Sequence, residues 1–174
     1  MPIKIIGLLG RSRSGKDTVA DHLMVLFPEY QIKRLSAPLK EASVALYGFT
    51  SAQIEGPLKE VTDARWSKTP RECIQSLTEY MMDHMGKDFF TKRLWDQCQS
   101  QHLTHIIIPD IRYEHDIYEI HRRGGIVIKV ERPNNPFPRH AFENQIDFIK
   151  GDYRILNDST IESLQKQVEQ LIKP

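Results

Sequence analysis

The chain has 174 residues, 40% of them hydrophobic, which is enough for one domain with a sizeable buried core and excludes a disordered or fibrous protein. Its 24 Lys and Arg residues balance 23 Asp and Glu residues to a formal net charge of +1, so no strong overall field attracts it to nucleic acid or to a membrane. Any site that binds an anion must therefore be local.

Cysteine usage and hydropathy favour a reducing compartment. Cys73 and Cys98 are too few for a disulfide scaffold and lack the spacing of metal ligands. No basic region or cleavage site precedes the first apolar run, and nowhere do about 18 apolar residues run together. We expect a cytoplasmic protein, in the host cytoplasm if it is viral, that binds neither nucleic acid nor a membrane.

Strand patterns and helix patterns alternate along the first third of the chain. Residues 3–9 form a continuous apolar run that stops at a glycine-rich turn, as is typical of a buried parallel strand. Apolar residues at helical spacing then predict a helix over 16–27, which Pro28 ends. A short strand over 32–35 and a helix from about Pro38 to Gly48 follow.

Residues 49–69 are polar without a sustained period, which predicts an inserted loop or a small excursion, a kind of insertion that often carries specificity. Strands that alternate with helices after this loop predict a parallel sheet covered on both faces, with ligands at the carboxyl ends of its strands. The remaining predicted elements are helices over 71–84 and 89–101, a strand over 104–108, a short helix before Gly124, a strand over 126–130, a lid over 132–151, a strand over 153–156 and a helix over 161–172.

Residues 10–16, Gly-Arg-Ser-Arg-Ser-Gly-Lys, fit the G-x-x-x-x-G-K core of a P-loop between a predicted strand and a predicted helix. The glycines allow a tight turn whose backbone N–H groups, with the helix N-terminus, face phosphate oxygens. Lys16 is expected to reach the β- and γ-phosphates. A glycine turn that merely links strand to helix would not need this lysine. The motif predicts ATP or GTP binding, with candidate cofactor-binding residues Gly10, Arg13, Ser14, Gly15, Lys16, Asp17 and Thr18.

Asp17 stands where this motif normally has a Ser or Thr that binds magnesium. A carboxylate there could hold Mg²⁺ directly or through a water, or orient a phosphate acceptor, and Thr18 could bond the α-phosphate. Alternatively, Asp17 only caps the first turn of the helix, an interaction of about 0.3 to 1 kcal/mol. We favour the metal role.

A second carboxylate, Asp110, follows the apolar run 106–108 and Pro109. A P-loop fold places the acid that holds the water shell of magnesium at such a strand end, although Asp is also common in turns there. Arg112, two residues on, could reach an acceptor phosphate or pair with a surface carboxylate. Asp110 is thus the second candidate metal ligand. Asp110 and Arg112 are also candidates for substrate binding.

Seven segments carry a wider pattern: 15–21 (GKDTVAD), 35–41 (LSAPLKE), 69–72 (TPRE), 86–90 (GKDFF), 109–113 (PDIRY), 124–133 (GGIVIKVERP) and 156–158 (LND). Together they resemble the deoxynucleoside monophosphate kinases found in phages and bacteria, over nearly the whole chain. The Lys-Asp pair at positions 16 and 17 belongs to that family's version of the loop.

The resemblance implies the three-layer α/β fold of P-loop nucleoside monophosphate kinases, with a five-stranded parallel sheet, a substrate-binding insertion and a lid. It implies a single domain, 1–174, in which about 48–100 form the substrate-binding helical region and about 132–151 the lid. The implied activity is Mg-ATP-dependent phosphoryl transfer to a (deoxy)nucleoside monophosphate, giving the diphosphate and ADP. Related kinases are often dimers, so the resemblance leaves a homodimer open.

The same resemblance implies an acceptor site. Arg65 and Arg71 would lie near the phosphate of the acceptor nucleotide and Gln75 near its base, unless they are ordinary surface residues. Trp66 is either a core residue or one that stacks on a base. Further candidates for substrate binding in the matching segment 35–41 are Ser36 and Lys40.

Phosphoryl transfer depends mostly on positioning and on neutralising the charge of the γ-phosphate oxygens, so a nearby cation is expected and a general base is not required. Arg132, at the end of the fourth strand, and Arg139, in the predicted lid, are candidates for this cation. They join Lys16 and Asp17 as candidate catalytic residues. We interpret His140 as an exposed loop residue.

Asn157 follows the last predicted strand. By resemblance it would border the adenine of ATP; otherwise it is a turn residue or a helix cap.

Two alternative functions remain open. The first is a kinase of the same architecture for another phosphorylated molecule, either phosphomevalonate or dephospho-CoA; phosphomevalonate has no base for Trp66 and Gln75 to contact. The second is a non-catalytic ATP-binding switch, which would not need arginines lining an acceptor pocket. The arginines in loops at the predicted strand ends favour transfer: Arg65, Arg71, Arg112, Arg132 and Arg139.

Overall fold

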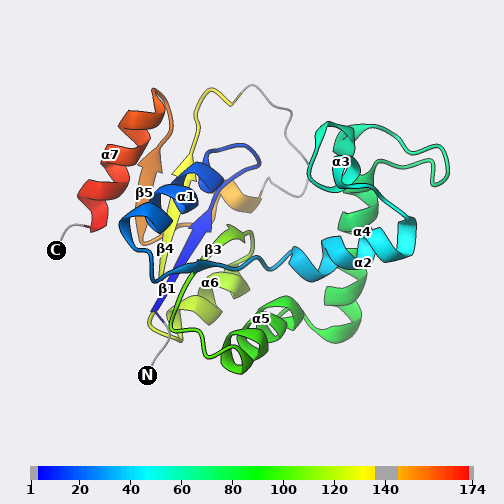
Figure 1. Ribbon diagram of the computed structural model, residues 1–174, viewed down its shortest axis with the longest axis horizontal. Coiled ribbons are helices and arrows are strands. Elements are labelled where there is room, and N and C mark those ends of the chain that lie inside the picture. The colour runs from blue at the N-terminus through cyan, green and yellow to red at the C-terminus, as the bar shows by residue number, and fades with distance from the viewer. Residues whose placement is uncertain (1–3, 136–144, 173–174) are drawn as a thin grey trace. The chain divides into compact units, whose positions relative to one another are not determined.

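A five-stranded parallel sheet organises one part of the molecule (Figure 1), seen in a computed structural model that describes residues 4–135 and 145–172. The strand order is β2-β3-β1-β4-β5, and every neighbouring pair is parallel. This confirms the expected α/β class and parallel sheet. The strands are β1 (Lys4–Leu9), β2 (Gln31–Ile32), β3 (His105–Ile111), β4 (Ile126–Glu131) and β5 (Tyr153–Leu156).

Backbone contacts divide the chain into two compact units. We call Met1–Arg34 with Leu94–Pro174 the sheet unit, and Leu35–Arg93 the helical unit. Each is described by itself below.

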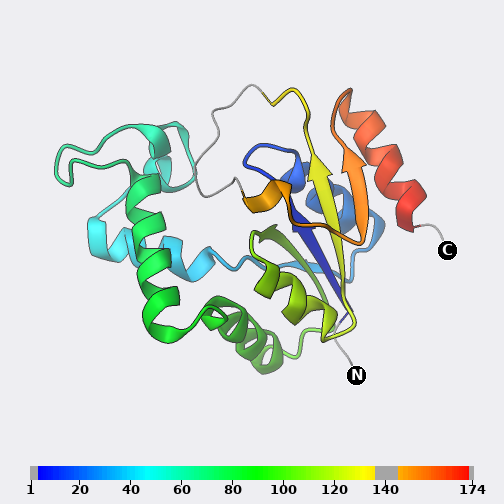
Figure 2. The same cartoon turned by 180° about the vertical axis from the view of Figure 1, so that it is seen from behind.

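Helices cover both faces of the sheet within the sheet unit (Figures 1 and 2). Alternate residues of β1 point to opposite faces, so Ile6 and Leu8 pack with Leu23 and Val168 of the helices on one face. On the other face Gly7 leaves room for Ile120, whose Cδ1 would lie 2.7 Å from a Cβ at position 7. These helices are α1 (Lys16–Leu26) and α7 (Ile161–Ile172) on the first face and α6 (Glu114–His121) on the second.

The helical unit has its own small core, in which Phe49, Ile54 and Cys73 are buried together. Its longest helix begins at a capping box, because the Thr69 side chain accepts a hydrogen bond from the Glu72 amide while the Glu72 carboxylate accepts one from the Thr69 amide. The elements are α2 (Ala37–Tyr47), α3 (Ser51–Ile54), the 3₁₀-helix η1 (Pro57–Glu60), α4 (Pro70–Met85) and the first turns of α5 (Phe89–Ser100).

The segment 49–69 is a small excursion rather than a plain loop, because it holds α3 and η1, which are too short to show a period. Two strand boundaries predicted from the sequence were wrong. The second strand is Gln31–Ile32 rather than 32–35. The third strand continues through Pro109 and Asp110, because the register shifts between Gly7 and Leu9 of β1, and β3 has an extra residue there. A bulge of this kind tolerates a proline, which has no N–H to donate.

No helix in the described residues is long and apolar enough to span a bilayer. The centre of the expected lid, with Arg139 and His140, lies outside the described residues.

Candidate functional site

The P-loop connects β1 to α1, in the position that its sequence predicts. Two glycines permit its tight course. A Cβ at Gly10 would lie 2.4 Å from the Val130 carbonyl oxygen and 2.7 Å from Ser14 Oγ, so only glycine fits there. Gly15 precedes α1 with φ +106°, a conformation that favours glycine. The loop therefore packs directly against the end of β4.

Two polar side chains, Lys16 and Ser14, are at least partly buried in the loop. Lys16 Nζ donates hydrogen bonds to the carbonyl oxygens of Gly10, at 2.8 Å, and Arg11, at 2.6 Å. Ser14 Oγ is buried and has no hydrogen-bond partner among the described residues. Buried polar atoms in proteins are nearly always bonded, so this hydroxyl indicates that the loop is built to meet a polar ligand. An ammonium, an unpaired hydroxyl and a helix N-terminus together suit a phosphate.

Asn157 holds the loop from the end of β5. Its side-chain amide donates to the Ser14 carbonyl oxygen at 2.9 Å, and its backbone N–H donates to the Glu131 carbonyl oxygen at 2.7 Å. The amide nitrogen would lie 2.5 Å from a Cβ at Gly15, which is a second reason for glycine at that position. Asn157 thus joins β4, β5 and the P-loop, and is not a helix cap.

The segments that flank the undescribed part of the expected lid are bound to the P-loop. Arg132 Nη1 donates to the Arg13 carbonyl oxygen at 3.4 Å, Asn135 Nδ2 donates to the Ser12 carbonyl oxygen at 2.9 Å, and Arg11 Nε donates to Asp147 at 2.8 Å. A pocket of about 310 Å³ lies among these segments and is lined in part by Gly10, Arg11, Ser14, Arg132, Asn135 and Asp147. Sequence reasoning missed Asn135 and Asp147, whose partners lie more than a hundred positions away.

The two candidate metal ligands occupy different surroundings. Asp17 is exposed on the first turn of α1 and accepts a hydrogen bond from Arg34 Nη2 at 2.7 Å. Asp110 is half-buried and is the second-to-last residue of β3. No cluster of three or more metal-binding side chains exists in the described residues. Magnesium in kinases commonly takes one or two carboxylates and completes its shell with phosphates and waters, so Asp17 and Asp110 are ligands of the type that Mg²⁺ requires.

Asp116 was not foreseen from the sequence. Its Oδ2 accepts hydrogen bonds from the backbone N–H groups of Arg112, at 3.2 Å, and Tyr113, at 3.1 Å, so it shapes the turn that follows β3 and carries Arg112. Burial raises the pKa of this carboxyl to about 7, and the nearby Asp110 adds to the rise. The capping spacing Tyr-x-x-Asp was the available signal, but tyrosine is an unusual residue before a helix.

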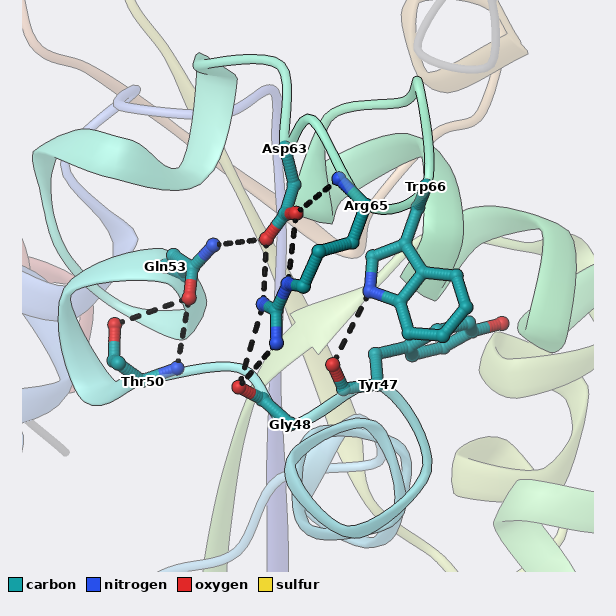
Figure 3. Close-up of polar contacts among 7 residues, drawn as sticks. All are labelled: Tyr47, Gly48, Thr50, Gln53, Asp63, Arg65 and Trp66. Atoms are coloured by element: carbon teal, nitrogen blue, oxygen red, sulfur yellow. Dashed lines mark hydrogen bonds and ion pairs between the residues drawn. The ribbon is translucent and has the colours of Figure 1, made fainter.

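In the helical unit, Arg65 and Trp66 share one loop (Figure 3). The Arg65 guanidinium forms an ion pair with Asp63, and the Trp66 indole N–H donates to the Tyr47 carbonyl oxygen at 3.1 Å. Trp66 is 43% exposed, so the expectation that it might be a core residue is wrong. Its ring lies edge-on against Tyr47 at 5.6 Å between centroids, and the Arg65 guanidinium carbon lies over the ring, 6.0 Å from its centroid.

The other candidate acceptor residues also have partners in the helical unit. Arg71, at the start of α4, pairs with Glu60 of η1, and one turn further Gln75 donates to Glu79 at 3.0 Å. Lys40 pairs with Glu55 at 2.6 Å. Ser36 immediately precedes α2 and makes no side-chain cap bond to it.

The structure therefore brings the P-loop candidates together with Arg132 and Asn157 in the sheet unit, where β3 also carries Asp110 and the turn after β3 carries Arg112. The helical unit carries the remaining substrate candidates: Ser36, Lys40, Arg65, Trp66, Arg71 and Gln75.

Two relatives match almost the full length of the chain. A putative deoxynucleotide monophosphate kinase of Acanthamoeba polyphaga mimivirus is 32% identical over 181 residues, covering 94% of this chain and 93% of the relative. The deoxynucleotide monophosphate kinase of Enterobacteria phage T4 is 22% identical over 241 residues, covering 98% and 99%.

Among solved structures, a dephospho-CoA kinase from Campylobacter jejuni superposes with a TM-score of 0.51 at 11% identity, covering 99% of this chain and 97% of that one. A likeness at this identity concerns the fold alone and does not favour the alternative acceptor.

A model of the family "deoxynucleotide monophosphate kinase" matches residues 48–168. The chain therefore belongs to the deoxynucleotide monophosphate kinase family, P-loop phosphotransferases whose acceptor is itself a phosphate group.

Proposed function

We propose that this chain transfers the γ-phosphoryl group of Mg-ATP to the phosphate of a deoxynucleoside monophosphate. An acceptor phosphate oxygen forms a bond to the γ-phosphorus, and the bond from that phosphorus to the bridging oxygen breaks, so ADP leaves with the electron pair. The observation that carries the proposal is the P-loop, where Lys16 and the buried Ser14 hydroxyl, which has no partner in the described residues, lie beside the N-terminus of α1.

The sheet unit would bind the donor. The backbone N–H groups of residues 10–15 and the start of α1 suit the β- and γ-phosphates. Lys16 would exchange its hydrogen bonds to two backbone carbonyls for bonds to phosphate oxygens, which carry full charge and attract an ammonium more strongly. Arg13 and Thr18 flank the same turn, and Asn157 would border the adenine while it holds the loop.

Asp17 and Asp110 would hold the magnesium ion. Its chemistry here is to neutralise charge that develops on the β- and γ-phosphate oxygens. Asp17 accepts a hydrogen bond from Arg34, which orients the Asp17 carboxylate and offsets its negative charge. Arg132 and Arg139 are our candidates for the cation that contacts the transferring group.

The candidate residues for the acceptor are those of the helical unit and, in the sheet unit, Arg112. Arg65, Arg71 and Arg112 suit a phosphate, because a guanidinium can bind two of its oxygens at once. The exposed Trp66 suits stacking on a base, and Gln75 suits hydrogen bonds to the edge of the base. We include Ser36 and Lys40 in this group, and we propose that residues 1–174 act as one kinase domain.

The test is ADP release from Mg-ATP with dTMP, dGMP, dCMP, dAMP, GMP, phosphomevalonate and dephospho-CoA in separate assays. We expect turnover with one or more deoxynucleotides and a loss of kcat/KM of roughly 100-fold or more in Lys16→Met, because a charge-stabilising contact in the transition state is removed. The control is Lys33→Met, since the Lys33 ammonium donates to Gln101 and belongs to no candidate set.

Turnover restricted to phosphomevalonate or dephospho-CoA would assign a different acceptor. ATP binding without turnover of any of them would instead identify a switch.

A further inference from the structure

A carboxylate in the helical unit has no role in the proposed function and yet accepts several hydrogen bonds beside the candidate acceptor residues (Figure 3). Asp63 is 7% exposed at its side chain, although it lies in a surface loop. Its two oxygens accept hydrogen bonds from Arg65 and Gln53, and these bonds come from two different segments of the unit. These hydrogen bonds and this burial indicate that the Asp63 side chain is held in one position and is not an ordinary solvated carboxylate.

The Asp63 carboxylate accepts hydrogen bonds from one edge of the Arg65 guanidinium. Arg65 Nε donates to Oδ1 at 2.9 Å and Nη2 donates to Oδ2 at 2.6 Å, which is a two-bond, fork-like pair. The Arg65 backbone N–H also donates to Oδ1, at 3.0 Å. The Arg65 hydrogen bonds lower the pKa of the Asp63 carboxyl, so it stays ionised at neutral pH.

Within the described parts of the chain, the other edge of the same guanidinium makes only long hydrogen bonds. Nη1 and Nη2 both lie 3.5 Å from the Gly48 carbonyl oxygen, at the limit of hydrogen bonding. A phosphate oxygen carries more charge than a carbonyl oxygen and bonds a guanidinium at about 2.7 to 2.9 Å. This outer edge can therefore accept a phosphate while Asp63 retains the inner edge.

Asp63 also closes the loop that displays Arg65 and Trp66. Its backbone N–H donates to the Lys68 carbonyl oxygen at 2.9 Å, and its carbonyl oxygen accepts from the N–H groups of Trp66, at 3.2 Å, and Ser67, at 2.9 Å. Gln53 Nε2 donates to Oδ2 at 2.7 Å and anchors the carboxylate to α3. Asp63, which holds the guanidinium, is thus itself held by the backbone of its loop and by Gln53 of α3.

We propose that Asp63 is a positioning residue that holds Arg65 with its outer edge ready for the phosphate of the acceptor nucleotide. This inference rests on the proposed function. An untethered arginine loses much rotational freedom when it binds a phosphate, whereas an arginine already held in one orientation loses little, so tethering strengthens acceptor binding.

The test compares Michaelis constants for the acceptor and for ATP in Asp63→Asn, using the deoxynucleotide that wild type phosphorylates fastest. Asparagine keeps an oxygen acceptor and the size of the side chain but loses the charge and the two-bond pair. We expect the acceptor KM to rise roughly tenfold or more, as for the loss of a charged hydrogen bond, while the KM for ATP stays within about twofold. The control Asp88→Asn removes another helical-unit carboxylate, which pairs with Lys92, and should leave both constants unchanged.

A double-mutant cycle separates positioning from general damage to the unit. If Asp63 acts through Arg65, then Asp63→Asn adds nothing to the acceptor KM of Arg65→Met, because the group that it positions is already gone. Arg65→Lys keeps the charge but lacks the fork, so it should behave like Arg65→Met. Independent, multiplying effects of the two substitutions would overturn the proposal, as would a wild-type acceptor KM in Arg65→Lys.

Circular dichroism and thermal unfolding establish whether Asp63→Asn is folded, and if it is not, the two Arg65 variants decide the question. Wild-type protein that phosphorylates no deoxynucleotide would defeat the proposed function itself. Active wild type with an unchanged acceptor KM in folded Asp63→Asn would defeat only the inference about Asp63.

Discussion

Asp63 and Asp116 are two carboxylates with nearly equal exposure, 7% and 5% at the side chain, whose pKa values move in opposite directions. Hydrogen bonds from Arg65 lower the pKa of Asp63, whereas burial raises the pKa of Asp116 above its ordinary value, despite two backbone N–H donors. A guanidinium supplies a full positive charge, while amides supply only partial charges. The Arg65 charge therefore keeps the pKa of Asp63 low, whereas the two amides offset only part of the effect of burial on Asp116.

The raised pKa of Asp116 predicts a dependence of stability on pH. The pKa is about 7 in the folded chain against an ordinary 3.8, so between these values the folded state binds more protons than the unfolded state. The free energy of unfolding should then fall as pH rises from about 4 to about 7, by up to about 1.4 kcal/mol per pH unit. In Asp116→Asn this pH-dependent fall in the free energy of unfolding should be absent.

Urea denaturation of wild type and Asp116→Asn at pH values from 4 to 8 measures that difference. The asparagine oxygen can still accept the Arg112 and Tyr113 amides, so the turn is retained. Parallel stability curves for the two proteins would show that Asp116 does not titrate in this range.

At the scale of elements, the start of α4 shows a local signal that is also the structural cause. Thr69, Pro70 and Glu72 form a capping box with proline in the first turn, and the box sets where the helix that carries Arg71 and Gln75 begins. The acceptor candidates on α4 are therefore placed by residues next to them in sequence.

Thr69→Ala removes the side-chain oxygen that caps α4, and we expect it to reduce the free energy of unfolding by about 1 kcal/mol. Thr78→Ala is the matched control within the same helix. Thr78 Oγ1 donates back to the Ile74 carbonyl oxygen, a bond that does not cap the helix, and alanine has the higher helix propensity. Thermal and urea unfolding of both variants checks the contrast. Equal destabilisation would show that the cap contributes nothing specific.

At the scale of the whole molecule, the candidate residues divide between two units, with the P-loop in one and Arg65, Trp66, Arg71 and Gln75 in the other. In each set, ion pairs and hydrogen bonds within the same unit hold several of the candidates. The two nucleotides should therefore protect different parts of the chain when each is added alone.

Amide hydrogen exchange tests this division. A non-hydrolysable ATP analogue should slow exchange in residues 10–18, and a deoxynucleoside monophosphate alone should slow exchange in residues 61–75, because bound ligands suppress local opening. The α7 helix, which carries no candidate residue, provides the reference. Protection of residues 10–18 alone by both nucleotides would contradict the assignment of the acceptor residues.

The sequence alone determined the alternation of strands and helices, the P-loop with Lys16 and Asp17, and the family, because these depend on spacing within short segments. Only the tertiary structure decided the strand order, the bulge in β3 at Pro109, and the partners of the site residues. Arg34 lies 17 positions from Asp17, and Asp147 lies 136 positions from Arg11. The course of the whole chain brings such pairs together, and no local pattern encodes it. Asp63 was missed for a related reason: it is two residues from Arg65, but its burial and its bond to Gln53 exist only once α3 has folded beside the loop.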